Sequence, residues 1–236
     1  MATVISAGSP GSRLRLGGMV LTAAKSVNTR PLQARLEAFG RAQRGYAAAQ
    51  GKVDAAEAAL HAAQAKVAHR DREQDEAVDA LARALISEGQ SRAKPFAGCG
   101  GPTPAALMRL PVAEQARQIH ALVTALQRNA GLSKAVQQAS DAADKAARAA
   151  EKALAPIEAL QVALSQARQA RDALVQTWEK TLAALKRGAR AAIDDGEPYL
   201  YTTLFGQAAR NGGRNGKHAP DNPPPAPPVP PVSSAA

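Results

Sequence analysis

A heptad pattern of large apolar residues runs through the first half of the chain and constrains its fold more than any other feature. A large apolar side chain recurs every seven positions, and alanine stands three residues after four consecutive members of this series. The large residues are Leu32, Phe39, Tyr46, Val53, Leu60 and Val67, and the alanines are Ala42, Ala49, Ala56 and Ala63. Such a repeat is typical of helices that pack along one another. Because alanine is small, the pattern favours antiparallel helices at short separation.

Three polar residues interrupt this series. Gln74 stands where the next large apolar residue is expected, before the series resumes at Leu81, and Arg35 and Arg70 stand at alanine positions. A long polar side chain at such a position is costly to bury unless it finds a hydrogen-bonding partner. We therefore expect the helix packing to loosen at these points.

The second half of the chain carries a related pattern that contains more alanine and one proline. The large apolar residues predicted to pack in the same seam are Ile157, Leu164, Trp178 and Leu185. Pro156 lies inside this segment, and because proline has no N–H it removes one helical hydrogen bond. We expect a kink at Pro156. A lone tryptophan at helical spacing favours a core residue over a ligand platform, so we assign Trp178 to the core.

Capping residues and glycines set the predicted helix bounds. The first long helix is predicted over residues 29–88 and the second over 133–195, and each ends at a glycine suited to a left-handed cap. A connector over 90–132 separates them and contains a shorter helix over 111–129. The terminating glycines are Gly89 and Gly196.

Composition supports an all-α fold with a thin core. The chain has 57 alanines, whereas leucine, isoleucine, valine and phenylalanine together number 42. Alanine has the highest helix propensity of any residue, so this balance suits long paired helices better than a compact globular core. We predict two long antiparallel alanine-rich helices forming a coiled-coil-like hairpin with a shorter connector helix. The expected organisation is a flexible leader over 1–28, the helical bundle over 29–206, and a disordered tail, basic and then proline-rich, over 207–236.

A short internal repeat links the ends of the two long helices. The segments 82–89 and 189–196 match at five of eight positions, at an offset of 107 residues. Duplication of a helical unit would produce this match, and so would chance in a chain rich in alanine and arginine. The sequence leaves both explanations open.

Charge and cysteine content restrict compartment and partners. The formal net charge is +10 and falls mainly in residues 1–28 and 90–132, so the chain should attract polyanions without presenting a focused patch. The single cysteine, Cys99, allows no intramolecular disulfide, which favours a reducing compartment, the cytoplasm. We see no segment that is long and apolar enough to span a membrane.

Residues with catalytic or metal-binding chemistry are present but not grouped. Cys99 lies in a glycine-rich loop without a legible base, and the loop lacks the Gly-Lys-Ser/Thr of a phosphate-binding motif. His61 and His69 are eight residues apart on one helix, His120 and His218 stand alone, and we expect all four to face solvent. We assign no catalytic, cofactor-binding or metal-binding residue and predict no enzymatic activity.

Two segments are candidate docking points for a protein partner. Asp194 and Asp195 lie at a helix C-terminus, where the helix dipole disfavours negative charge, so they need compensation from a basic partner or from a local bond. Pro224 and Pro227 form a Pro-x-x-P spacing that aromatic grooves recognise, although inert spacers carry the same spacing.

These observations favour a non-enzymatic helical scaffold or protein–protein interaction protein, acting through a partner or through self-association. The alternative is a basic surface-coating protein that binds a polyanion, such as nucleic acid, an anionic membrane surface or a storage granule. Nucleic acid is not favoured at this stage because the basic residues are dispersed along the chain and aromatic residues are few.

The heptad pattern can be tested by overpacking it. Replacing Ala49 or Ala56 with leucine should lower the free energy of unfolding by about 1 to 3 kcal/mol, because a closely packed seam has no room for the added atoms. The control is Ala58→Leu, which lies on the flank of the helix and should be nearly neutral. Urea denaturation followed by circular dichroism measures all three, and equal midpoints for Ala49→Leu and Ala58→Leu would contradict the close-packed pair.

Overall fold

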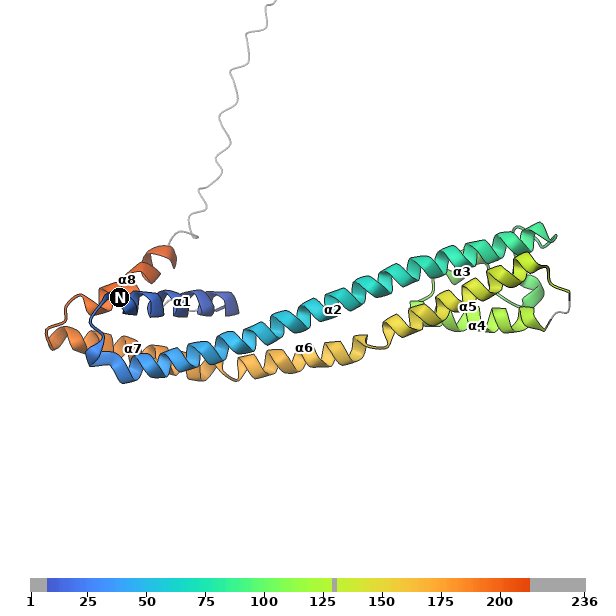
Figure 1. Cartoon of the computed structure of the whole chain (residues 1–236). Helices are drawn as coiled ribbons and strands as arrows, with labels where there is room; N and C mark the ends of the chain where they lie inside the picture. The colour runs from blue at the N-terminus through green and yellow to red at the C-terminus, as the bar shows by residue number, and fades with distance from the viewer. Residues whose placement is uncertain (1–7, 129–130, 213–236) are drawn as a thin grey trace, which may run out of the picture. The chain divides into compact units, whose positions relative to one another are not determined.

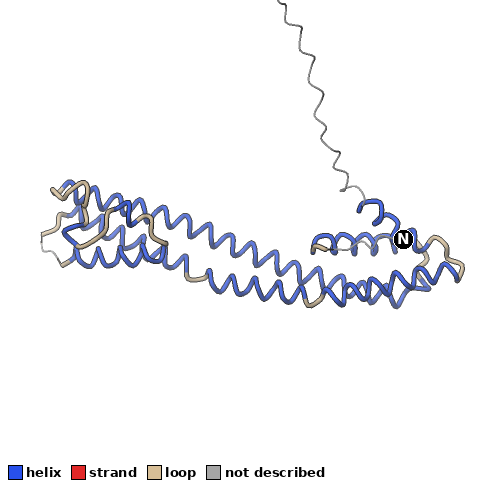
Figure 2. Tube along the Cα trace, turned by 180° about the vertical axis from the view of Figure 1, so that it is seen from behind, coloured by secondary structure: helices blue, strands red, loops and turns tan. Residues whose placement is uncertain are grey.

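The computed structural model describes residues 8–128 and 131–212, with only the backbone described for 207–212. Every regular element in this part of the chain is a helix (Figures 1 and 2). The α-helices are α1 (Pro10–Ala23), α2 (Gln33–Ser87), α3 (Pro104–Leu107), α4 (Val112–Gln127), α5 (Lys134–Leu154), α6 (Ile157–Asp172), α7 (Val175–Asp194) and α8 (Leu200–Gly212). Short 3-10 turns lie at Ala24–Ser26, Arg30–Leu32 and Ala97–Cys99.

The chain divides into two compact units. Unit 1 comprises residues 1–43 and 180–236, of which 8–43 and 180–212 are described, and unit 2 comprises residues 44–179. The division crosses α2 and α7 within their lengths, so each long helix contributes residues to both units.

The predicted second long helix is present as three segments. A kink was predicted at Pro156, and there the helix is interrupted: α5 ends at Leu154 and α6 begins at Ile157. A second break, at Ala173 and Leu174, was not predicted. There the Leu174 N–H donates to the Arg171 carbonyl, a tighter turn than the α-helical bond would make. Neither residue is proline or glycine, so no local signal marks this break.

The two glycine stops have the same backbone structure. Gly89 has φ 92° and Gly196 has φ 93°, in the left-handed region that favours glycine. Each glycine N–H bonds to the carbonyl three residues back, and the following N–H bonds to the carbonyl five residues back, which is the Schellman motif. The repeated segments 82–89 and 189–196 therefore end their helices in one and the same way.

The apolar core of unit 2 joins the last part of α2 with α4 and α5. Phe96 and Leu107, from the connector, are buried in it, so the connector is part of the packed structure. A Cβ added at Gly101 would come within 2.9 Å of Phe96 and Leu122 side-chain atoms, so the chain needs glycine to pass there. The other core residues include Val78, Leu81, Leu85, Ala116, Ile119, Val123, Leu126, Val136, Ala143 and Ala147.

A polar contact lies beside this core where α4 begins. The Gln115 side-chain N–H donates to an Asp75 carboxylate oxygen at 2.7 Å, and the rest of the Gln115 side chain is buried. The neighbouring Gln74, at its heptad position, is fully buried, and neither polar atom of its side chain has a hydrogen-bond partner in the described residues. An unpaired buried amide lowers the free energy of unfolding by about 1 to 3 kcal/mol. The polar layer formed by Gln74, Asp75 and Gln115 therefore reduces stability.

Burial of the predicted seam residues is uneven. In unit 2, Tyr46, Val53, Leu164 and Trp178 are buried, whereas Leu60, Val67 and Ile157 are only half-buried. In unit 1, Leu32, Phe39 and Leu185 are buried. The alanines Ala49 and Ala56 are half-buried, and Ala58 is exposed.

Unit 1 contains a helix where we expected a flexible leader. Helix α1 covers residues 10–23, is capped by the Ser9 side chain, and packs against α8 (Figure 1). Its residues Leu16, Gly17 and Val20 are buried. The Gln43 amide donates to the Leu14 carbonyl at 3.2 Å and occupies the space where a Gly17 side chain would lie. Helix α8 continues to Gly212, and the rest of the predicted tail lies outside the described residues.

Trp178 should contribute strongly to the stability of unit 2. Its side chain is 1% exposed, and its ring centroid lies 6.4 Å from that of Tyr46. Trp178→Ala should lower the free energy of unfolding by about 3 to 5 kcal/mol, because it removes a large buried ring and leaves a cavity. The control is Tyr199→Ala, since Tyr199 is 80% exposed and should change stability little. Thermal or urea unfolding measures both, and similar effects of the two variants would be inconsistent with this packing.

Candidate functional site

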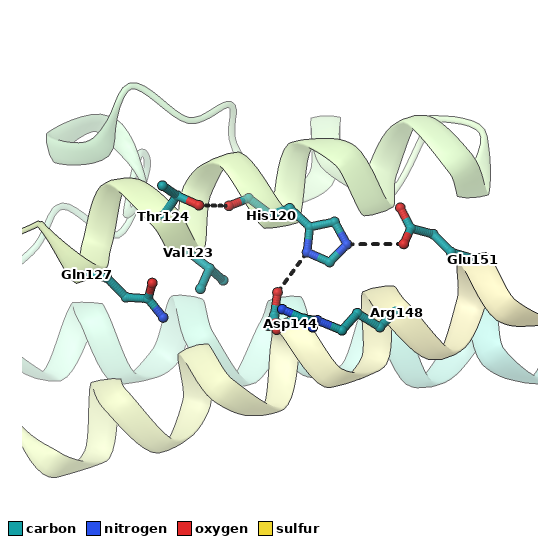
Figure 3. A pocket seen from close by; sticks show the side chains of 7 residues that line it. All are labelled: His120, Val123, Thr124, Gln127, Asp144, Arg148 and Glu151. Atoms are coloured by element: carbon teal, nitrogen blue, oxygen red, sulfur yellow. Dashed lines mark hydrogen bonds and ion pairs between the residues drawn. The ribbon is translucent and has the colours of Figure 1, made fainter.

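A polar depression lies on unit 2, between α4 and α5. It has a volume of about 380 Å³ and opens to solvent. Helices α4 and α5 run side by side with their apolar faces in the core, so polar residues on the flanks of both faces line the groove between them (Figure 3). The lining residues are His120, Val123, Thr124, Gln127, Asp144, Arg148 and Glu151.

His120 is at the centre of this depression, between two carboxylates of α5. Its Nδ1 lies 2.7 Å from Oδ1 of Asp144, and its Nε2 lies 3.4 Å from Oε2 of Glu151 (Figure 3). Because an ionised carboxylate only accepts hydrogen bonds, the short contact requires a proton on Nδ1. Asp144 also accepts from Nε of Arg148 at 2.8 Å, so its charge is shared between two basic groups.

The geometry of this cluster ties two helices together. The two carboxylates approach different nitrogens of the ring, so they cannot join the same imidazole nitrogen in holding one metal ion, and no group of metal-ligating side chains is found in the described residues. The one hydroxyl in the lining, that of Thr124, donates to the His120 carbonyl at 2.8 Å. With no nucleophile facing the imidazole, the cluster acts as an electrostatic link between α4 and α5.

The prediction that His120 faces solvent is wrong. The side chain is 28% exposed and bonded on both sides, because α4 packs against α5 and brings two acidic side chains to it. Asp144, Arg148 and Glu151 are spaced so that they lie on one face of α5. This spacing was the only local signal of the His120 cluster in the sequence. Nothing in the sequence marks which residue of another helix would lie between them.

The other histidines and the cysteine lie apart from the depression. His61 and His69 are exposed, and Nε2 of His69 lies 3.5 Å from a Glu73 carboxylate oxygen on the same helix. Cys99 is half-buried and packs against the core of unit 2. His218 lies outside the described residues.

The candidate docking points are not brought together with the depression. Asp194 and Asp195 are exposed at the end of α7 in unit 1. Arg190, four residues before Asp194, donates from Nη2 to the Tyr201 hydroxyl at 3.2 Å. Pro224 and Pro227 lie outside the described residues.

Comparison of the chain with protein-family models, with curated proteins and with solved structures finds no match. Within the described residues, no helix combines the length and the apolar character that crossing a membrane requires.

Cys99 should be a poorly reactive thiol. Burial raises the pKa of the Cys99 thiol above its ordinary value, so less thiolate, the reactive form, is present at a given pH than in the unfolded chain. Alkylation by iodoacetamide should therefore be slower in the native protein and should accelerate at higher pH than in the urea-unfolded control. Cys99→Ser should leave helicity unchanged. Native alkylation as fast as that of the unfolded chain would show an exposed thiol instead.

Proposed function

We propose that this protein is a non-enzymatic helical scaffold that binds another protein along the middle of unit 2, and that the first such partner is a second copy of the chain. The single observation that supports the proposal is the half-exposed seam between α2 and α6. On α2, no residue between Val53 and Gln74 is buried, and on the opposing segment only Leu164 is buried between Ala153 and Trp178.

The half-buried residues of this stretch follow the heptad pattern on both helices. On α2 they include Leu60 and Val67, and on α6 they include Ile157 and Leu160. Arg168 Nη2 donates to a Glu57 carboxylate oxygen at 2.6 Å, and farther along α6 Arg171 Nη1 donates to the Gln50 side-chain oxygen at 3.2 Å, so the two helices run in opposite directions. Two antiparallel helices bury only one side of each apolar stripe, whereas four helices around a common core bury the stripes fully. We define the seam patch as Leu60, Val67, Ile157 and Leu160.

Charge supports a second copy as the occupant. Residues 52–73 of α2 contain four basic and four acidic side chains, and α6 contains two of each, so both segments have no net charge. Two copies would therefore meet along this stretch without electrostatic repulsion. Mixed charges beside an apolar stripe are the usual flanks of paired helices, where they select partner and orientation.

The alternative function, polyanion binding, also has one observation in its favour. The excess of positive charge belongs to unit 1, whereas the neutral seam patch belongs to unit 2. This distribution is compatible with a scaffold that self-associates through one region and meets an anionic partner through another.

The experiment is sedimentation velocity over a range of protein concentrations. The parent chain should form a dimer, and Leu60→Gln combined with Val67→Gln should weaken self-association more than about tenfold, because it removes apolar surface from both copies. The matched control is Ala58→Gln combined with Ala65→Gln, two exposed positions on the same helix, which should leave the dimer intact. Circular dichroism verifies that all variants keep their helicity. A parent chain that sediments as a monomer at every concentration contradicts the proposal.

A further inference from the structure

We propose that the basic face of α7 in unit 1 binds the phosphate backbone of nucleic acid without sequence specificity. The site is separate from the seam patch, and the proposal does not depend on self-association. We define the basic face as Lys180, Lys186, Arg187 and Arg190.

The fold concentrates positive charge that is dispersed along the sequence. The described part of unit 1 contains eleven Lys and Arg against four Asp and Glu, a net charge of +7, because the fold gathers residues 8–43 and 180–212 into one unit. Unit 2 contains seventeen Lys and Arg against fifteen Asp and Glu, a net charge of +2. The sequence places the surplus in the leader and connector, whereas the structure places most of it in unit 1.

Four of these cations form one stripe on α7. At about 100° per residue, the four residues of the basic face fall within an arc of about 120°. This arc lies opposite the face on which Leu182, Leu185 and Ala189 are buried. No carboxylate in the described residues lies within ion-pair distance of any of the four, although Glu179 and Asp194 of the same helix fall in this arc, one beyond each end of the stripe.

Helix α8 holds two of the cations in place. The Lys186 ammonium lies 5.6 Å from the ring centroid of Phe205, and the Arg190 guanidinium lies 5.1 Å from that of Tyr201. The two rings contact each other with centroids 5.3 Å apart. An aromatic face attracts a cation without cancelling its charge, so these contacts restrict the side chains and leave them available to an anion.

A further cation lies against the flank of the same helix. The side chain of Arg35, from α2, occupies the space where a Gly188 Cβ would stand, which explains glycine in the interior of α7. Any larger residue would displace this guanidinium. Arg35 thus adds a positive charge to unit 1, on the side of α7 that packs against α2, about 140° around the helix from the centre of the basic face.

The geometry fits a nucleic-acid strand better than an anionic membrane. From Lys180 to Arg190 the helix rises about 15 Å, close to the axial length of four nucleotides in one strand of a duplex. A membrane-bound helix needs an apolar face toward the lipid, but the apolar face of α7 is buried in protein.

The test is the salt dependence of binding to a short fluorescent DNA duplex of random sequence, measured by anisotropy from about 50 to 200 mM salt. The parent chain should bind with a slope of log K against log salt near −3 to −4, as four neutralised phosphates predict. Lys180→Gln combined with Arg187→Gln should make this slope shallower by about 1.5 to 2 and weaken binding at 50 mM salt roughly a hundredfold. Both side chains are exposed.

The matched control removes the same charge from unit 2, as Lys66→Gln combined with Lys145→Gln, two exposed positions. It should leave the slope unchanged. An equal loss of DNA affinity in the two double variants would mean that net charge alone attracts the DNA, and would overturn the proposed site. Absence of binding at low salt, or binding to vesicles of phosphatidylserine and phosphatidylcholine but not to DNA, would also overturn it. The dimer variant Leu60→Gln, Val67→Gln should bind with an unchanged slope, which separates this proposal from the scaffold function.

Discussion

The small size of the alanine side chain is the constraint on which this structure depends. Alanine lets two helices approach closely, but each alanine removes little apolar area from water, so a seam built from it contributes little stability per residue. The fold adds a further layer where more area is needed: α4 and the connector in unit 2, and α1 and α8 in unit 1. In the middle of unit 2 no such layer is present among the described residues, and Leu60 and Val67 remain half-buried there.

Local signals in the sequence predicted the two long helical segments and their glycine stops. The missing N–H of proline predicted a kink at Pro156, where one helix ends and the next begins, and two glycines predicted the left-handed stops. Several residues of the heptad series, such as Leu60, Val67 and Ile157, are only half-buried. Features that depend on a distant segment were not predictable in this way. The break at Ala173 has no local cause, and α1 is held by burial of Leu16 and Val20, which requires a partner surface that a linear pattern does not reveal.

The same limit applies to the candidate sites. His120 has no unusual neighbours in sequence, and its environment comes from α5, a helix that begins after the next loop. The basic face of α7 was hidden because a division of the sequence into consecutive segments separates residues 8–43 from residues 180–212. Charge density is a property of surfaces, so it could be judged only after the chain ends were grouped. Unit 1 has a net positive charge, whereas the segments that carry the seam patch have none, so the two regions suit different kinds of partner.

The polar layer near the start of α4 has a consequence for how the chain finds its alignment. A seam with a large apolar residue and alanine every seven positions makes similar contacts after one helix slips by a heptad against the other. Apolar packing alone therefore distinguishes weakly between neighbouring alignments. Gln74 and the bond between Gln115 and Asp75 occur at one level only. A slipped chain would set an apolar residue opposite this level and lose that bond. The Gln74 amide thus lowers stability but helps to specify a single register of the repetitive helices.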